Sequence, residues 1–165
     1  MAFVDAFLPE YDHEMKTTRS LLERVPIEKF DWKPHAKSTS LGALASHIAN
    51  LAGYGALVAT SEESNFAASG SRYVPPEYRT RDALLKTFDE NVKKTREAVI
   101  ALSDHDLRQP WSLKNGDVTI FTLPRTATFR TFMMNHMIHH RGQLSVYLRE
   151  NDVALPSIYG PTADM

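Results

Sequence analysis

The side chains in this chain best suited to chemistry are its histidines. Three of the seven, His136, His139 and His140, fall within five residues, and His47 lies in a separate apolar segment. Imidazole binds divalent metals, exchanges protons near neutral pH and forms hydrogen bonds through either ring nitrogen. The chain contains no cysteine, which excludes disulfides, thiolate metal ligands and a cysteine nucleophile.

Helical spacing predicts that two of these histidines share one face. At about 100° per residue, His136 and His140 lie about 40° apart, whereas His139 falls on the flank. His47 stands in the apolar stripe of another predicted helix. An unpaired buried imidazole costs about 1–3 kcal/mol, and one divalent metal would satisfy all three rings. Three protein ligands leave coordination positions open, which is typical of catalytic sites.

A second interpretation of these histidines stays open. They can be core or loop-facing residues that hydrogen-bond to polar neighbours, because the spacing of one histidine pair is a weak signal. His139 alone is more typical of packing or of support for a ligand. Competing motifs are incomplete: Met137 stands where a metalloprotease helix carries glutamate, and Val58 where a dinucleotide-binding loop has its third glycine.

Four amphipathic segments have to position these side chains. Apolar residues recur every three to four positions in each segment, Thr39 or Ser40 can cap the second, and Thr80 can cap the third. The connections are long, and Asn115-Gly116 indicates either a hairpin or an ordered loop. We predict a single all-α domain, a four-helix bundle with long inter-helix loops, over residues 1–165. The predicted helices cover residues 3–24, 40–60, 81–102 and 124–150.

Composition narrows the classes of function. The net charge of −1 provides no strongly basic balance for nucleic-acid binding. No run of 18 apolar residues indicates a membrane span, and the first residues lack a signal-peptide pattern. We therefore expect a cytoplasmic protein whose partner is a small-molecule substrate rather than nucleic acid or a membrane.

Several motifs together carry a family resemblance. Residues 135–144, Asn-His-Met-Ile-His-His-Arg-Gly-Gln-Leu, contain two histidines four apart followed by Arg-Gly-Gln. Residues 41–49 contain a single histidine in a small-residue helix, and Trp32-Lys33-Pro34 with Ser38 precedes them. Residues 156–164 form a Pro- and Tyr-containing tail. In this combination, over nearly the whole chain, the sequence resembles the DinB/YfiT-like family.

This resemblance implies a four-helix bundle of unusual connectivity, often a homodimer, with a divalent metal held by His47, His136 and His140. Zinc or nickel is the first expectation, with iron or manganese as further options. Characterised members of the family include thiol-dependent S-transferases and a maleylpyruvate isomerase. The resemblance thus implies a metal-dependent transferase or isomerase that acts on a small electrophile. Because the chain has no cysteine, a low-molecular-weight thiol would have to arrive as a cosubstrate.

Further residues are candidates for roles beside the metal or in a pocket. Gln143 can orient a ligand, and Arg141 can bind an anionic substrate group, a helix partner or a surface carboxylate. Gly142 in a predicted helix costs about 1 kcal/mol relative to alanine and predicts a close helix–helix approach. The remaining candidates, which can equally be core residues, are His139, Tyr54 and Asn50.

Other functions stay open beside the thiol-dependent enzyme. One is a metal-assisted hydrolase, since a metal can activate water as well as a thiol. Another is a non-catalytic stress protein, a helical bundle that binds a metal or sequesters a ligand. The last is a structural dimer whose histidines are core residues only.

Overall fold

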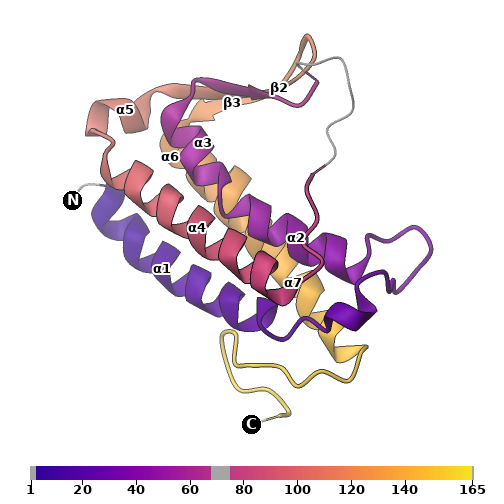
Figure 1. The fold of residues 1–165 in the computed structure, drawn as a ribbon. Coiled ribbons are helices and arrows are strands. Elements are labelled where there is room, and N and C mark those ends of the chain that lie inside the picture. Colours follow the sequence, from indigo (N-terminus) through magenta and orange to yellow (C-terminus); the bar gives the residue numbers. More distant parts are fainter. Residues whose placement is uncertain (1–2, 68–74, 165) are drawn as a thin grey trace.

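In a computed structural model of the protein, four long helices run side by side and a small sheet lies at one end (Figure 1). The structure describes residues 3–67 and 75–164. Helices α1 and α2 each contact both α4 and α7, so the four surround an apolar core. The four are α1 (Phe3–Leu22), α2 (Leu41–Leu51), α4 (Arg81–Ile100) and α7 (Asn135–Arg149).

The loop before α2 and the starts of two helices follow the sequence signals. Residues 23–40 contain only the short 3-10 helix η1 (Ile27–Lys29). Ser40 then caps α2 by accepting a hydrogen bond from the Ala43 N–H, 3.2 Å away. Thr80 caps α4 in the same way through the N–H of Ala83, also at 3.2 Å. Both predicted caps are therefore present. Each satisfies one of the N–H groups that the first turn of a helix leaves free.

A three-stranded sheet shows that the prediction of an all-α chain is wrong. After α5 (Asp104–Arg108), the strands β2 (Pro110–Asn115) and β3 (Val118–Pro124) pair antiparallel. Gly116 in their turn has a φ of 61°, so Asn115-Gly116 marks a hairpin, one of the two predicted alternatives. The strand β1 (Glu63–Asn65) pairs parallel with β2 at the other side. The protein is therefore mostly helical with a small sheet.

The single helix predicted over residues 40–60 is divided into α2 and α3 (Tyr54–Thr60). Thr95 of α4 is fully buried at the break. Its hydroxyl donates to the carbonyl of Ala52 (2.6 Å) and accepts from the N–H of Ala56 (3.0 Å). A side chain from another helix thus satisfies the backbone groups that the break frees.

Glycine allows α3 to approach α4 closely at this break. A Cβ at Gly55 would lie 2.2 Å from Cγ2 of Thr95, too close for any real contact. The Gly55→Ala variant is therefore expected to lower the free energy of unfolding by about 1–3 kcal/mol, because the added methyl overpacks a buried contact. Urea denaturation at neutral pH measures the loss.

Gly142→Ala is the matched control for this prediction. A Cβ at Gly142 would meet nothing within 4 Å, so the prediction of a close helix–helix approach there is wrong. Alanine is the better helix former, and we expect this variant to be as stable as the native chain or slightly more so. Equal losses in both variants would contradict the packing account.

The helix predicted over residues 124–150 is not regular throughout. It begins as α6 (Arg125–Thr128), widens into the π-helical turn η2 (Phe129–Met134) and continues as α7. Such wide turns inside helices are frequent at functional sites. Here the turn ends at Met134, two residues before His136, the first histidine of the segment.

The buried face of α7 differs from the predicted stripe. Its core positions are Met137, Arg141, Leu144 and Leu148, whereas His136 and His140 are half-buried on one shoulder of that face. The apolar spacing predicts His136 and His140 inside the inward stripe of their helix, whereas the structure places them on its shoulder. The apolar pattern missed the true centre because one core position is an arginine.

Arg141 is held in the core by an ion pair to α1. Its exposed fraction is 1%, and one guanidinium nitrogen lies 2.6 Å from the carboxylate of buried Glu14. A second nitrogen donates to the hydroxyl of Tyr159 at 2.6 Å, and that hydroxyl contacts the same carboxylate. Of the predicted alternatives for Arg141, the structure shows the helix partner. The irregular tail that follows α7 is tied to the bundle through Tyr159.

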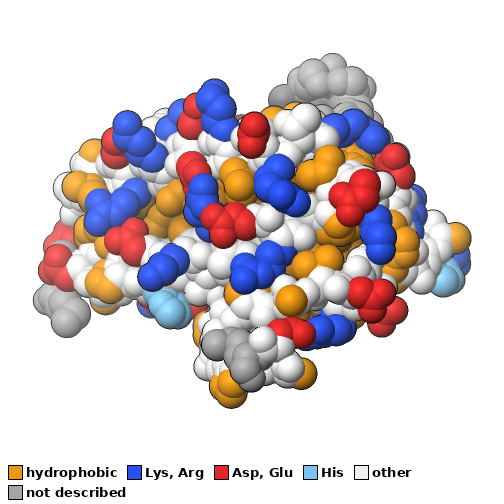
Figure 2. Space-filling model, turned by 60° about the horizontal axis from the view of Figure 1, so that its bottom comes forward, with side chains coloured by type: hydrophobic (Ala, Val, Ile, Leu, Met, Phe, Trp, Pro, Cys, Tyr) orange, Lys and Arg blue, Asp and Glu red, His pale blue; other side chains and the backbone are white. Residues whose placement is uncertain are grey.

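The surface mixes both signs of charge. Exposed ion pairs join α1 to α4 through Arg19 with Asp89 and Arg96 with Asp12. Figure 2 shows basic and acidic side chains interspersed over the face that it presents. By length and composition the helical stretch over residues 41–60 could cross a membrane, but 61% of its most apolar window is buried inside the fold, as in an ordinary core helix.

Candidate metal centre

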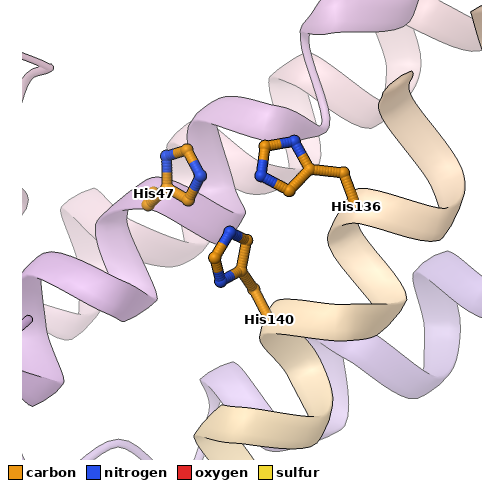
Figure 3. A group of neighbouring side chains, drawn as sticks. All are labelled: His47, His136 and His140. Carbon is orange, nitrogen blue, oxygen red and sulfur yellow. The ribbon is translucent and has the colours of Figure 1, made fainter. Parts of the chain in front are cut away.

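Three histidines from two helices converge on one point. His47 projects from α2, His136 and His140 project from α7, and the rings face one another (Figure 3). Their potential ligand nitrogens all lie within 4.8 Å of one another. The ring centroid of His47 lies 5.3 Å from that of His136 and 4.7 Å from that of His140. The structure therefore brings together the three residues that the sequence predicts as ligands.

The geometry of this three-histidine cluster fits a small divalent metal. Nitrogen–metal distances of about 2.0–2.1 Å in a tetrahedral site require ligand nitrogens about 3.4 Å apart. The observed spread of up to 4.8 Å needs only a modest contraction of three half-buried side chains. Imidazole ligands suit several transition metals, among them zinc, copper, iron and nickel. Three ligands also leave part of the coordination sphere open.

The surroundings keep the three rings neutral, which metal binding requires. Burial, together with the neighbouring His140 and His136, lowers the pKa of His47 to about 4. Burial is also the main cause that lowers the pKa of His136, against a hydrogen bond to the backbone of Phe132. The pKa of His140 is lowered by burial as well. At neutral pH each ring is therefore uncharged and has one unprotonated nitrogen whose lone pair can bind a metal.

These lowered pKa values predict how the stability of the metal-free protein depends on pH. Between pH 6.5 and about 4, the unfolded chain binds a proton on His47 that the folded chain does not bind. The free energy of unfolding should therefore fall as the pH drops through this window. Urea denaturation at several pH values measures the slope, and His47→Asn should flatten it. An unchanged slope in His47→Asn would contradict the assignment of the pH dependence to His47. His13 is exposed, so His13→Asn is the control and should keep the native slope.

Gln143 fixes the orientation of one ring. Its side-chain oxygen Oε1 lies 2.7 Å from Nδ1 of His140. Because an amide oxygen only accepts hydrogen bonds, Nδ1 carries the proton and Nε2 is left with its lone pair. This is the usual way in which a neighbouring polar group sets the tautomer of a metal-binding histidine. This contact is the one that the orienting role suggested for Gln143 requires.

The Gln143→Ala variant is expected to weaken zinc affinity about 10- to 100-fold, because the His140 ring loses the partner that sets its tautomer. Competition with a zinc-binding dye measures the dissociation constant. Gln109→Ala is the matched control, since Gln109 makes a similar contact of 3.0 Å with His105 outside the cluster. Equal weakening in the two variants would show that the contact to His140 has no special role.

Two hollows adjoin the three-histidine cluster. The first, which we call the lysine cavity, has a volume of about 490 Å³ and lies beside His47 and His140. The second, the aromatic groove, has a volume of about 320 Å³ and lies beside His136. The lysine cavity is lined by residues 37–39, Ala43, Leu44, Pro75, Gln143 and Tyr147, and the aromatic groove by Phe121, Leu123, Thr131 and Phe132.

The other sequence candidates lie around the cluster without joining it. His139 is exposed, with its ring 5.0 Å from that of His140. Tyr54 stacks on Phe132 at 5.4 Å, on the side of the aromatic groove. Asn50 contacts the segment after residue 74, because it accepts a hydrogen bond from the Tyr78 hydroxyl at 2.7 Å. Arg141 points into the core and away from both hollows.

Sequence reasoning missed the loop that closes the lysine cavity. Lys37 and Thr39 line it from the segment before α2, and no spacing rule places a loop side chain relative to a helix. The one available signal is Trp32, a large aromatic residue within this long polar segment. Its ring meets that of Tyr147 edge-on at 5.5 Å, which ties this loop to α7.

Proteins of known sequence or structure resemble this chain over almost its full length. The uncharacterized protein YrdA of Bacillus subtilis (strain 168) is 24% identical over 167 residues, which cover 98% of this chain and 90% of that protein. The crystal structure of a DinB-like protein from Bacillus cereus ATCC 10987 has a TM-score of 0.70 at 20% identity, over 94% of this chain and 97% of that one. DinB-like YjoA from Bacillus subtilis has a TM-score of 0.66 at 22% identity, over 97% and 99%.

These structural likenesses concern the fold, because the sequence identities are low and a shared fold does not fix a function. The sequence itself matches a known family along almost its full length, from residue 2 to residue 164. That match includes every residue of the three-histidine cluster. The chain therefore belongs to the DinB family.

Proposed function

We propose that this protein is a metal-dependent enzyme that transfers a low-molecular-weight thiol to a small electrophile, or isomerises such a compound with the thiol's help. One observation carries the proposal: three neutral imidazoles converge at the edge of a cavity large enough for a small molecule. A purely structural metal site would instead be closed by a fourth protein ligand.

The metal would be held by His47, His136 and His140, with zinc or nickel as the preferred ion. A divalent cation in that position would lower the pKa of a thiol or water beside it and so supply a nucleophile at neutral pH. Gln143 keeps His140 in the ligating tautomer. The side chains around the lysine cavity and the aromatic groove bind and orient the reactants.

The thiol has to come from outside the chain, which has no cysteine. In the transfer, the thiol loses its proton and its sulfur forms the new bond to carbon. The leaving group departs with the electron pair of the broken bond, and nothing is oxidised. In the isomerase variant, the sulfur adds to a double bond and is later eliminated, so that the thiol is regenerated.

Metal-dependent thioether formation tests this proposal. The zinc-loaded and nickel-loaded proteins are mixed with cysteine or mercaptoethanol and with chlorodinitrobenzene, whose thioether product is measured by absorbance. We expect acceleration that disappears after chelation and in His140→Ala. Fully loaded protein that accelerates no reaction with either thiol contradicts the proposal. Thiol-independent cleavage of nitrophenyl acetate in its place would indicate a metal-assisted hydrolase.

A further inference from the structure

The three-histidine cluster stands between two hollows of opposite character. Beside His47 and His140 lies the lysine cavity, which has polar and charged side chains on one wall. Beside His136 lies the aromatic groove, in which Thr131 and the histidine are the only polar lining residues among those described. A molecule that reacts at the cluster therefore meets different surroundings on its two sides.

The wall of the lysine cavity formed by residues 37–39 suits an anion. Within the described part of the chain, the side chains of Lys37, Ser38 and Thr39 take part in no hydrogen bond or ion pair. No carboxylate occurs among the described residues that line this cavity. The ammonium and the two hydroxyls are thus available to a ligand, and a carboxylate accepts hydrogen bonds from both kinds of group.

The aromatic groove has a fixed apolar wall. The ring of Phe132 is held by Tyr54 at 5.4 Å, by Trp111 at 5.6 Å and by Phe121 at 5.6 Å. The hydroxyl of Thr131 is already bonded to the carbonyl of Ala127 at 2.8 Å. A flat apolar group can pack on this wall without leaving a polar group unsatisfied.

The two hollows are close enough to serve one small molecule. The ring of His136 lies 6.3 Å from that of Phe132 in the aromatic groove and 4.7 Å from that of His140 beside the lysine cavity. A chain of a few atoms spans such distances. Its middle would then lie in front of the three histidines.

We propose that the electrophilic substrate is a small carboxylate with an apolar or aromatic arm, its carboxylate bound by residues 37–39 and its arm by the wall at Phe121 and Phe132. The inference rests on the proposed function for the reaction at the cluster, but the binding itself requires neither thiol nor turnover. Lys37 and Phe121 are thus specificity-determining residues, one for the charged end and one for the apolar end.

Phenylbutyrate and its neutral amide test the inference as probes, titrated into the metal-free protein with binding followed by NMR. The amide should bind about fivefold more weakly than the acid, because a partly exposed ion pair contributes up to about that factor. Lys37→Ala should remove this difference, whereas Lys33→Ala, on the same loop but outside the cavity lining, should keep it. Phe121→Ala should weaken both probes, and Val118→Ala, on exposed β3, should weaken neither.

Equal affinity of the native protein for the acid and the amide would overturn the inference. It would also be overturned if Lys37→Ala and Lys33→Ala reduced the difference in affinity between acid and amide equally. A repeat with zinc-loaded protein shows whether the metal adds to binding, without affecting the metal-free comparison. Because no catalysis is measured, failure here leaves thioether formation to be judged by its own assay. Conversely, selective binding of phenylbutyrate stands even where the thiol assay is negative.

Discussion

Replacement of Arg141 by alanine is expected to lower the free energy of unfolding by about 3–5 kcal/mol. The guanidinium is the partner of the Glu14 carboxylate, which is only 6% exposed, and a buried charge left without its partner is strongly destabilising. The tail also loses the contact from Arg141 to Tyr159 that ties it to the helices. Urea denaturation at neutral pH measures the change.

Arg149→Ala is the matched control, because Arg149 pairs with Asp164 at the surface and such pairs contribute about 0–1 kcal/mol. The double variant Arg141→Met with Glu14→Leu should recover much of the loss, since it removes both buried charges together. Comparable losses in Arg141→Ala and Arg149→Ala would show that the buried pair does not hold α7 against α1.

Zinc is expected to stabilise the native chain and to leave the ligand variants unchanged. At a free zinc concentration 100-fold above the dissociation constant, binding to the folded state alone contributes about 2.7 kcal/mol. For a domain of this size that corresponds to a rise in Tm of about 5–10 °C. His47→Ala and His140→Ala should abolish the rise, because each removes one of three convergent ligands. Differential scanning calorimetry with and without zinc measures it.

His139→Ala separates the three-histidine cluster from a general affinity of histidines for zinc. His139 neighbours His140 on α7, but it is exposed and lies outside the cluster. The native rise in Tm should persist in this variant. Its loss in His139→Ala, or its persistence in His47→Ala, would mean that zinc binds elsewhere.

The convergence of His47, His136 and His140 could be predicted from the sequence because it follows local rules. Helical spacing relates His136 to His140, and the position of His47 in an apolar helix directs it to the same interior. The depth of the rings could not be predicted. Arg141 occupies a core position that an apolar pattern cannot recognise, and its partner Glu14 is 127 residues away in the sequence. The histidines consequently lie on a shoulder, open to two hollows.

The observed fold differs from the predicted one where contacts between segments far apart in the sequence decide the local structure. Nothing local in residues 40–60 predicts that Thr95 enters a break between two helices. The hairpin was signalled by Asn115-Gly116, yet its pairing with Glu63–Asn65 depends on a strand of three residues that is too short for any periodicity. Lys37 and Thr39 reach the cluster from a loop, where side-chain position follows from packing rather than from spacing.

Metal analysis of the untagged native protein, beside His47→Ala, tests the central claim most directly. The three-histidine cluster predicts about one divalent metal per native chain, as purified or after incubation with zinc or nickel followed by dialysis. His47→Ala should retain almost none under the same conditions. Native protein that retains neither zinc nor nickel would contradict the metal centre and leave three hydrogen-bonding histidines at the edge of a cavity.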